Sequence, residues 1–232
     1  MSADVRRRFS IAARWPLGVA ITSWRYMWRT TPMRRHESRG SLPDDAPPAI
    51  PESLALTDTH YPENGAGHMY RRRYRVLISE TTMTAEDLMT RISSDPNVVS
   101  PTDLARFEKR KGQENAMSLG DEFLVRMPGP WDGPVRVVDL TSNSFRFATL
   151  RGHLEAGQIE FRMKGKGDDL VVEIESWARA GDRLSHVMFD TLRMAKEIQL
   201  HMWTSMLERI ADLSGGRRGS ISIETRWVEI DG

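Results

Sequence analysis

The sequence predicts an α+β domain in which a curved antiparallel sheet wraps one long C-terminal helix, a helix-grip fold, with an N-terminal extension. Three observations support this prediction. Short stretches of alternating apolar and polar residues follow one another from about residue 121 to 177, separated by turns, as in an antiparallel meander. One long stretch with helical spacing follows at about 182–213. The 232 residues, 39% hydrophobic and 28% charged, suit one domain with a real core plus extensions.

A half-buried strand is expected to open the domain, followed by two short helices. The apolar residues of the strand alternate with arginines and are Tyr70, Tyr74, Val76 and Ile78. Thr84 can cap the first helix, and the apolar residues of that helix are Leu88, Met89 and Ile92. The second helix is expected to start near Pro101 and to end at Gly112. It would bury Leu104 and Phe107.

Five strands are expected next, in quick succession. They cover residues 121–127, 135–140, 144–150, 158–164 and 170–177. The residues that can point inward are Phe123, Val125, Val135, Val137, Phe145, Phe147, Ile159, Phe161, Val172 and Ile174. Those that then point outward are Arg136, Arg146, Glu160, Arg162, Glu173 and Glu175. We interpret the outward set as a solvated ladder of cross-strand ion pairs rather than as a catalytic pair of carboxylates.

The longest helix is expected from Asp182 to Leu213. Its apolar positions recur at three- and four-residue steps and are Leu184, Val187, Met188, Thr191, Ala195, Ile198, Met202, Met206 and Ile210. Gly215 and Gly216 would end the helix, and residues 221–227 alternate as a last strand. In such a fold the natural cavity lies between the helix and the concave face of the sheet. Methionines on the helix would give that cavity an adaptable lining.

The charge distribution divides the chain into three parts. Residues 1–40 hold nine arginines against two acidic residues, which is +7. Residues 41–67 hold five acidic residues, five prolines and no Lys or Arg, which is −5, and the remainder is −1. Prolines at that density favour extended backbone, so the acidic Pro-rich residues 38–67 are interpreted as a linker that can drape over the body. The linker joins a basic aromatic segment at 1–37 to the helix-grip domain at 68–232.

The basic segment carries three of the seven tryptophans, Trp15, Trp24 and Trp28, among its arginines. Two interpretations of it stay open. In the first it is a helix that packs on the body or on a second subunit, so that a protein partner or an oligomer fits. In the second it lies on an anionic membrane surface, with Trp at headgroup depth and Arg on phosphates. Residues 6–9, Arg-Arg-Arg-Phe, resemble a twin-arginine export signal, but no small-residue cleavage site follows. We therefore expect a cytoplasmic protein, peripheral to a membrane if the second interpretation holds.

The composition excludes several classes of function. The absence of cysteine excludes disulfides, thiol nucleophiles and cysteine-ligated metals. The six histidines form no metal-binding motif, and no glycine-rich turn joins a strand to a helix as phosphate binding requires, so we expect neither a metal nor a cofactor. No stretch approaches the roughly 18 apolar residues of a spanning helix. The net charge of +1 gives no indication of nucleic acid.

One stretch carries a resemblance to a known family. Residues 145–157, Phe-Arg-Phe-Ala-Thr-Leu-Arg-Gly-His-Leu-Glu-Ala-Gly, resemble the most distinctive part of a family of uncharacterised bacterial and plant domains. In that family a strand ending in a Gly-Thr-Leu-like step is followed by Gly-His, an acidic residue and Gly. Trp131 and Arg179 also fit. The resemblance covers roughly residues 65–213 and extends to the START-like, polyketide-cyclase (SRPBCC) superfamily, whose members bind lipids, steroids and polyketides between helix and sheet.

The resemblance also selects candidate site residues. They are Thr149, Gly152, His153, Glu155, Gly157 and Arg179. Our catalytic candidates are His153, Thr149 and Glu155, because a histidine with an acidic neighbour can transfer protons near neutral pH. The alternative is that His153 only fixes the turn. Our candidates for ligand binding are Phe145, Phe147, Phe161, Ile174, Arg179, Met188, Thr191 and Met202.

Three functions fit these observations. The first is binding of a hydrophobic small molecule, such as a lipid, a polyketide or an isoprenoid-like compound, in the cavity between the sheet and the long helix. The second is an enzyme of the cyclase or aromatase type that uses His153. The third is a non-catalytic interaction or regulatory protein whose core is filled. The sequence leaves open whether the chain is an enzyme.

Overall fold

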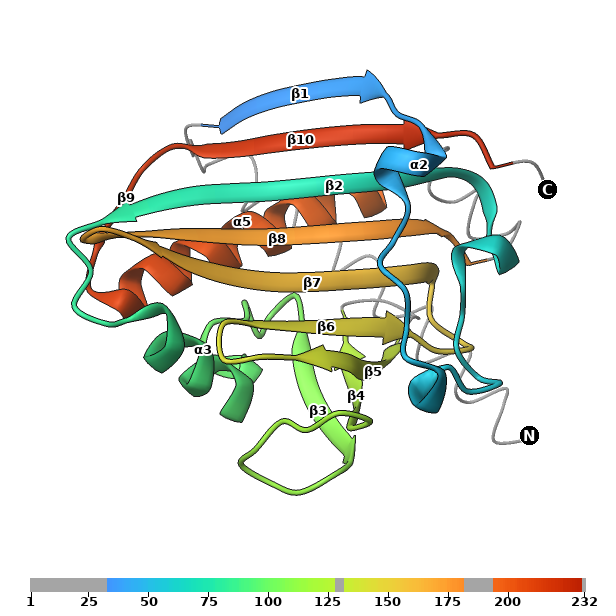
Figure 1. Cartoon of the computed structure of the whole chain (residues 1–232), viewed down its shortest axis with the longest axis horizontal. Coiled ribbons are helices and arrows are strands. Elements are labelled where there is room, and N and C mark those ends of the chain that lie inside the picture. Colours follow the sequence, from blue (N-terminus) through green and yellow to red (C-terminus); the bar gives the residue numbers. More distant parts are fainter. Residues whose placement is uncertain (1–32, 128–131, 182–193, 231–232) are drawn as a thin grey trace.

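The computed structural model describes residues 33–127, 132–181 and 194–230, and in these ranges a ten-stranded sheet dominates the molecule (Figure 1). Across the sheet the strands are ordered β1 (Met33–Arg39), β10 (Ile221–Val228), β2 (Ala66–Ser79), β8 (Asp169–Ala180), β7 (Glu155–Lys166), β6 (Ser144–Thr149), β5 (Asp132–Leu140), β4 (Glu122–Arg126) and β3 (Arg106–Lys111). The short β9 (Arg217–Arg218) pairs with the end of β2. Neighbours along this order are antiparallel except β1 and β10, which run parallel at one edge.

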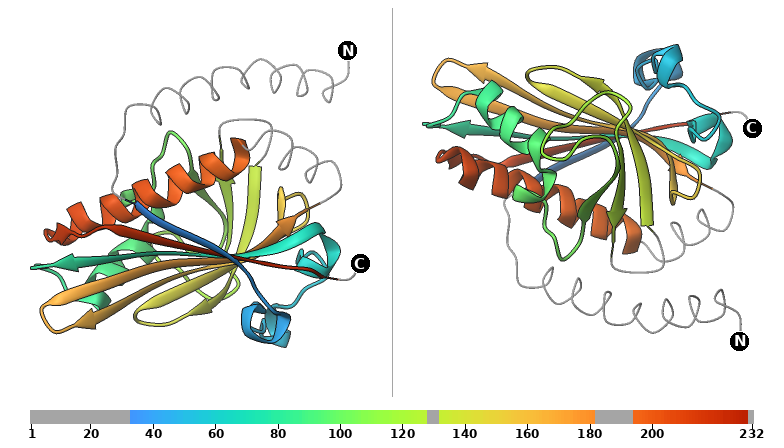
Figure 2. Two further views of the ribbon diagram at one scale, coloured as in Figure 1. Left: turned by 90° about the horizontal axis from the view of Figure 1, so that it is seen from above. Right: turned by 90° about the horizontal axis from the view of Figure 1, so that it is seen from below.

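The long helix α5 (Met194–Ser214) lies against one face of the sheet (Figure 2), which confirms the predicted helix-grip fold. It ends as the sequence indicates, because Gly215 adopts a positive φ of 70° that a helix C-terminus favours. The start predicted at residue 182 lies outside the described residues, as do residues 1–32 of the basic segment. The helix α3 (Ala85–Ser94) begins at its predicted cap, where the Thr84 side chain accepts a hydrogen bond from the Asp87 N–H.

The second short helix is a wrong prediction. Residues 96–98 form a 3-10 turn, and a single turn closes after Pro101 through bonds from Leu104 N and Ala105 N to its carbonyl oxygen. Residues 106–111 then form β3, which pairs with β4. The Asn97 side chain bonds both the N–H and the carbonyl of Phe107, at 2.8 and 2.9 Å. Tertiary pairing therefore overrides the helix-start pattern in this segment.

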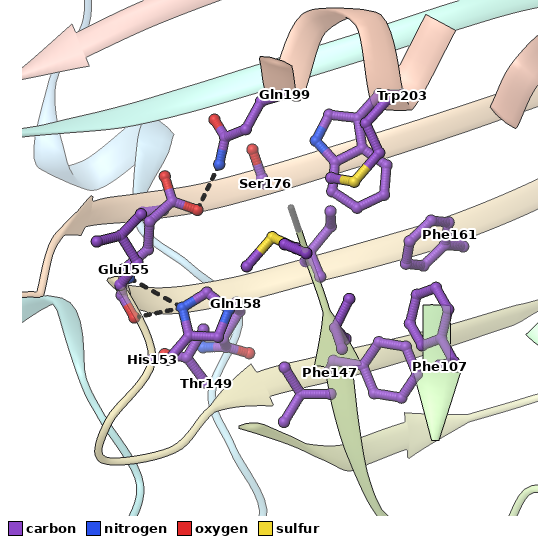
Figure 3. Close-up of a pocket in the computed structure, with 17 residues that line it drawn as sticks. Phe107, Phe147, Thr149, His153, Glu155, Gln158, Phe161, Ser176, Gln199 and Trp203 are labelled. Atoms are coloured by element: carbon purple, nitrogen blue, oxygen red, sulfur yellow. Dashed lines mark hydrogen bonds between the residues drawn. The ribbon is translucent and has the colours of Figure 1, made fainter. Parts of the chain in front are cut away.

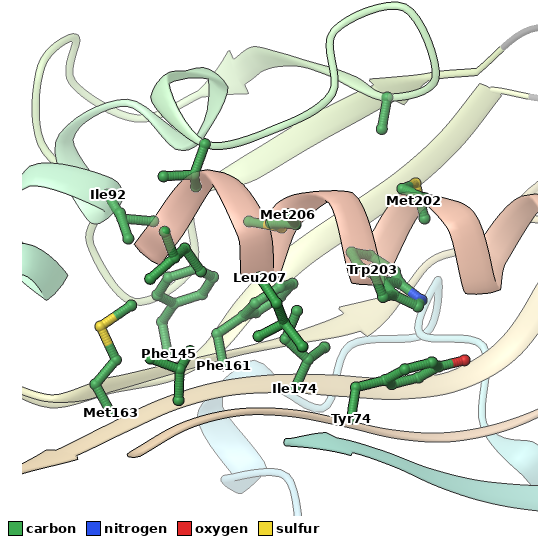
Figure 4. Close-up of a cluster of buried hydrophobic side chains, with 14 of the residues drawn as sticks. Tyr74, Ile92, Phe145, Phe161, Met163, Ile174, Met202, Trp203, Met206 and Leu207 are labelled. Atoms are coloured by element: carbon green, nitrogen blue, oxygen red, sulfur yellow. The ribbon is translucent and has the colours of Figure 1, made fainter. Parts of the chain in front are cut away.

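The predicted inward residues are confirmed as core. All ten lie in or against the buried apolar cluster. The aromatic rings of Phe107, Phe123, Phe145, Phe147, Phe161 and Trp203 contact one another in a chain with centroid distances between 4.7 and 6.5 Å. Figure 4 shows Trp203, Met206 and Leu207 of α5 directed at this layer. One end of the space between helix and sheet is thus solidly packed.

The outward residues are not a solvated ladder, which corrects the prediction. Residues 41–64, which we call the strap, cross the outer face: α2 (Leu42–Asp45) lies over β2, and the chain then passes over β8, β7 and β6 towards η1 (Glu52–Leu54) and η2 (Pro62–Asn64) (Figure 1). Beneath it Arg136 and Glu175 are each only 2% exposed. Arg146 and Gln158 donate to the carbonyl oxygens of Ala49 and Pro48. The acidic, proline-rich composition of the strap therefore serves to cover a charged sheet face.

Asp45 anchors the strap. Its side chain is fully buried, accepts a hydrogen bond from Arg71 at 2.9 Å and from the Ser41 N–H at 2.9 Å, and lies 3.6 Å from Arg226. Arg71 also bonds Glu175 at 2.7 Å, so one guanidinium joins the strap to β8. Burial alone would raise the pKa of Asp45, but the bonds from Arg71 and Ser41 and the charge of Arg226 hold it below its ordinary value.

We predict that Asp45→Asn destabilises the protein by about 3 kcal/mol at neutral pH, because removing one charge of a buried pair leaves its partners uncompensated. Urea denaturation measures the difference. The matched control is Asp44→Asn, because Asp44 is exposed and, within the described residues, its carboxylate side chain bonds only the Ser41 hydroxyl. Since the folded pKa of Asp45 is lowered, the wild-type advantage is complete above its ordinary pKa of 3.8 and disappears as the pH falls below that. Equal stability of the two variants at pH 7 would contradict the anchoring role of Asp45.

Candidate functional site

A cavity of about 130 Å³ remains where the packing of α5 against the sheet stops (Figure 3). Most of its wall is apolar and comes from strands β3 to β8 and from α5, with Phe107, Phe147, Phe161, Met202 and Trp203 as the large contributors. The polar side chains on its wall are Thr149, His153, Glu155, Gln158, Ser176 and Gln199. Figure 3 shows His153, Glu155 and Gln199 grouped apart from the phenylalanines. The cavity thus has an apolar end and a polar end.

The polar end is built on the loop between β6 and β7. Thr149, the last residue of β6, accepts a hydrogen bond from the Gly157 N–H at 2.8 Å, and its hydroxyl lies 3.1 Å from the His60 carbonyl oxygen. Gly157 is required there because a side-chain Cβ would come within 1.9 Å of the Trp177 carbonyl oxygen in β8. Thr149 and Gly157 therefore fix where the loop leaves the sheet, and with it the position of His153 and Glu155.

His153 is held as a neutral ring. Its Nδ1 accepts the Glu155 N–H at 2.9 Å and also lies 3.0 Å from the carbonyl oxygen of that residue. The contact with the N–H group suits a neutral ring whose proton is on Nε2, and the contact with the carbonyl oxygen suits one whose proton is on Nδ1. The pKa of His153 is lowered to about 4: burial lowers it most, the hydrogen bond with the Glu155 backbone opposes this, and the charge of nearby His60 adds a smaller lowering. At neutral pH the ring is an uncharged hydrogen-bond donor.

Glu155 is tied to the helix rather than to His153. One carboxylate oxygen accepts a hydrogen bond from Gln199 Nε2 at 2.6 Å, and Gln199 Oε1 in turn lies 3.3 Å from Arg72 Nη1. Arg72 is 8% exposed and stacks over the Tyr70 ring at 4.7 Å. Burial raises the pKa of Glu155, and this outweighs the lowering by the charge of Arg72 and the bond from Gln199. Because Arg72 donates to Gln199 Oε1, the amide must turn its NH₂ towards Glu155.

The predicted site residues fall into three groups. Those on the cavity wall are Thr149, His153, Glu155, Phe147, Phe161 and Met202. Phe145 and Ile174 are fully buried in the packed part and do not line the cavity. Arg179 is also off the cavity wall, with its guanidinium bonded to the carbonyl oxygens of Gly67 and Pro62. Met188 and Thr191 lie outside the described residues.

Gln199 and Ser176 were missed by sequence reasoning. Gln199 precedes Met202 and Met206 at helical spacing, so it lies on the apolar face of α5. Ser176 alternates with the inward Ile174 of β8. A lone polar residue within each apolar pattern was the available signal. In the described ranges no cluster of side chains could hold a metal ion, and no helix is long and apolar enough to cross a membrane.

The part of the chain that forms the cavity matches a known family. Residues 100–209 match the family described as "Domain of unknown function (DUF1990)". This confirms the resemblance that residues 145–157 predicted. The match spans every residue that lines the cavity, from Phe107 to Trp203. No curated protein shows significant sequence similarity to the chain.

Several solved structures are similar in outline at low identity. A hypothetical protein from Helicobacter pylori is 9% identical with a TM-score of 0.47, covering 72% of this chain and 96% of its own. The di-domain ARO/CYC StfQ from the steffimycin biosynthetic pathway is 10% identical with a TM-score of 0.48, covering 66% and 52%. Norcoclaurine synthase from Thalictrum flavum is 11% identical with a TM-score of 0.44, covering 63% and 87%. None of these similarities indicates what this chain binds or catalyses.

We predict that the His153 ring is neutral and carries its proton on Nε2 at pH 7, and that it titrates near pH 4. Nitrogen NMR of the imidazole groups measures both, with His153→Gln identifying the resonance. Because the folded pKa is lowered, the unfolded chain takes up the proton first. Wild type should therefore lose stability relative to His153→Gln as the pH falls from 6.5 towards 4. A midpoint near 6.5 would show that the ring is open to water.

Proposed function

We propose that this chain binds a small, mainly apolar molecule that carries one hydrogen-bonding group, in the cavity between α5 and the sheet. The observation that supports this most is the division of the cavity, with phenylalanines at one end and the uncharged His153 and the Glu155–Gln199 pair at the other. Ligand sites in general combine an apolar lining with a few polar groups that fix orientation. A cavity of about 130 Å³ also argues against the alternative of a wholly filled core.

The volume of the cavity limits the size of the ligand that can fit. An apolar cavity of about 150 Å³ holds benzene, whereas sites for drug-sized ligands measure roughly 300–1,000 Å³. The volume of about 130 Å³ is therefore suited to a single ring or a short branched chain. A lipid, polyketide or isoprenoid-like ligand would place one such portion here, with its oxygen towards His153. The neutral Nε2–H suits a carbonyl or hydroxyl oxygen as acceptor, and the carboxylate of Glu155 suits a hydroxyl as donor.

We predict that 4-methylphenol binds more tightly than toluene, by about fivefold, because one net hydrogen bond contributes about 1 kcal/mol. Ligand-observed NMR on the full chain measures both affinities, and native mass spectrometry of the purified protein shows any ligand that remains bound.

Ser176→Leu should weaken the binding of both compounds by about tenfold or more. The leucine side chain would enter the space that the ligand occupies, and forcing a side chain into a filled space costs about 1–3 kcal/mol. The control is Ser142→Leu, which lies exposed in the turn after β5. Equal binding to the two variants would mean that the probes occupy another place, and the absence of binding together with a ligand-free purified protein would refute the proposal.

Glu155 supports a second candidate function, proton transfer on the bound molecule. A carboxylate whose pKa is raised by burial is a stronger base than one in water, and perturbed groups in cavities are typical of catalytic acids and bases. In this scheme ionised Glu155 removes a proton from carbon beside a carbonyl group. The Nε2–H of His153 donates a hydrogen bond to the oxygen on which negative charge develops. Water then gives a proton to the carbon, and the hydroxide that remains takes the proton from the Glu155 carboxyl group, which restores the carboxylate.

For this second function we predict that the protein accelerates exchange of the methyl protons of acetophenone in D₂O, followed by ¹H NMR. Exchange should rise with pH as Glu155 ionises, through a midpoint above 4.5. Glu155→Gln should remove the acceleration, by at least about 100-fold, the lower limit for a general base. The control is Glu114→Gln, an exposed carboxylate in the loop after β3. If Glu155→Gln binds acetophenone normally and exchanges it as wild type does, Glu155 is not a base.

A further inference from the structure

A second hollow, of about 290 Å³, lies at the sheet edge formed by β1, β10 and β2, away from the cavity. Its lining includes Arg34, His36, Arg73, Arg75, Ser222 and Glu224. Four arginines in all line the hollow, and Glu224 is its one carboxylate. The charge of Glu224 is already engaged, because it bonds Arg226 at 2.9 Å and lies 3.8 Å from Arg73. The hollow is therefore strongly positive.

Strand register brings two of these arginines to the same row. Arg34 of β1 pairs with Ser222 of β10, and Ser222 pairs with Arg75 of β2. Directly paired residues direct their side chains to the same face. Strands lie about 4.8 Å apart, so the two arginine Cα atoms stand roughly 10 Å apart across the serine. Two long guanidinium side chains can close that separation on one shared ion.

The two arginines of this row differ from other arginines of the outer face in forming no ion pair within the described residues. Arg71, Arg73 and Arg162 are each held by at least one acidic side chain. Arg75 pairs in register with Glu173, but Glu173 bonds Arg162 instead. In the described part of the chain neither Arg34 nor Arg75 forms an ion pair, and both are exposed. Among the described residues, the bond of the Ser222 hydroxyl is a long one, 3.4 Å to a main-chain oxygen.

We propose that this hollow binds a phosphate group. Two arginine forks and a hydroxyl present donors on either side of one position, which suits a tetrahedral oxyanion better than an isolated carboxylate. The phosphate can belong to a soluble phosphomonoester or to a lipid headgroup, and the chemistry of recognition is the same. The site is independent of the function proposed for the cavity.

The test uses the full chain and two charge-matched variants. Arg34→Ala/Arg75→Ala removes the row. Arg106→Ala/Arg151→Ala removes two exposed arginines that form no ion pair in the described ranges and lie outside the hollow. A third variant, Arg34→Lys/Arg75→Lys, keeps the charge and loses the forks. Backbone NMR is recorded with inorganic phosphate and with glycerol 3-phosphate, against sodium chloride at equal ionic strength.

We expect phosphate to shift the amide signals of residues 34–36, 75 and 222, with affinity at least about tenfold weaker in the alanine pair and intermediate in the lysine pair. A second arm measures flotation with vesicles of phosphatidylcholine containing phosphatidic acid. The phosphate belongs to a lipid headgroup if two results occur together. Soluble phosphates then cause no shift, and the vesicles bind wild type and the Arg106/Arg151 variant better than the Arg34/Arg75 variant. If neither arm separates the two alanine variants, the proposal is wrong.

Discussion

The hydroxyl of Thr149 is the contact on which the polar end of the cavity depends. It accepts the Gly157 N–H at 2.8 Å and lies 3.1 Å from the His60 carbonyl oxygen, while the Thr149 main chain accepts the His60 N–H at 2.8 Å. One residue thus joins the strap on the outer face to the loop that carries His153 and Glu155. A change in the strap would therefore reach the cavity wall through these bonds. The threonine that the resemblance selected is, in this structure, a positioning residue.

The cavity exists because large and small side chains are segregated along the sheet. At one end Phe145, Phe161 and Ile174 meet α5 and fill the space. At the other end the sheet presents Ser176, Ala178 and Gly157, which are too small to reach the helix. Protein interiors are packed so densely that few cavities of this size remain. This cavity remains because no large side chain fills it. The order of large and small residues along β7 and β8 therefore determines where the cavity lies.

The sequence predicts the fold well where a pattern is local. Alternation in β2 and in β4 to β8, together with the three- and four-residue steps of α5, determines which side of each element is buried, and the core follows from it. It fails where the deciding contact is distant. Phe107 lies in a strand because Asn97 and β4 bind its backbone, and Arg136 is buried because Asp58 of the strap bonds it at 2.7 and 2.9 Å. Gln199 was overlooked because its partners, Arg72 and Glu155, are 127 and 44 residues away in the chain.

The pKa of a buried carboxylate on this sheet depends on the arginines that it contacts. On the outer face Glu175 meets Arg71 and Arg73 directly, and its pKa falls despite burial. On the same face burial raises the pKa of Glu160, although it bonds Arg162 at 3.2 Å. On the inner face Glu155 meets an arginine only through Gln199, and its pKa rises. Direct contact with several arginines therefore keeps Glu175 ionised, whereas Glu155, inside the cavity, can exchange a proton. Glu160 shares the raised pKa, and Glu155 differs from it in lining the cavity between the sheet and α5.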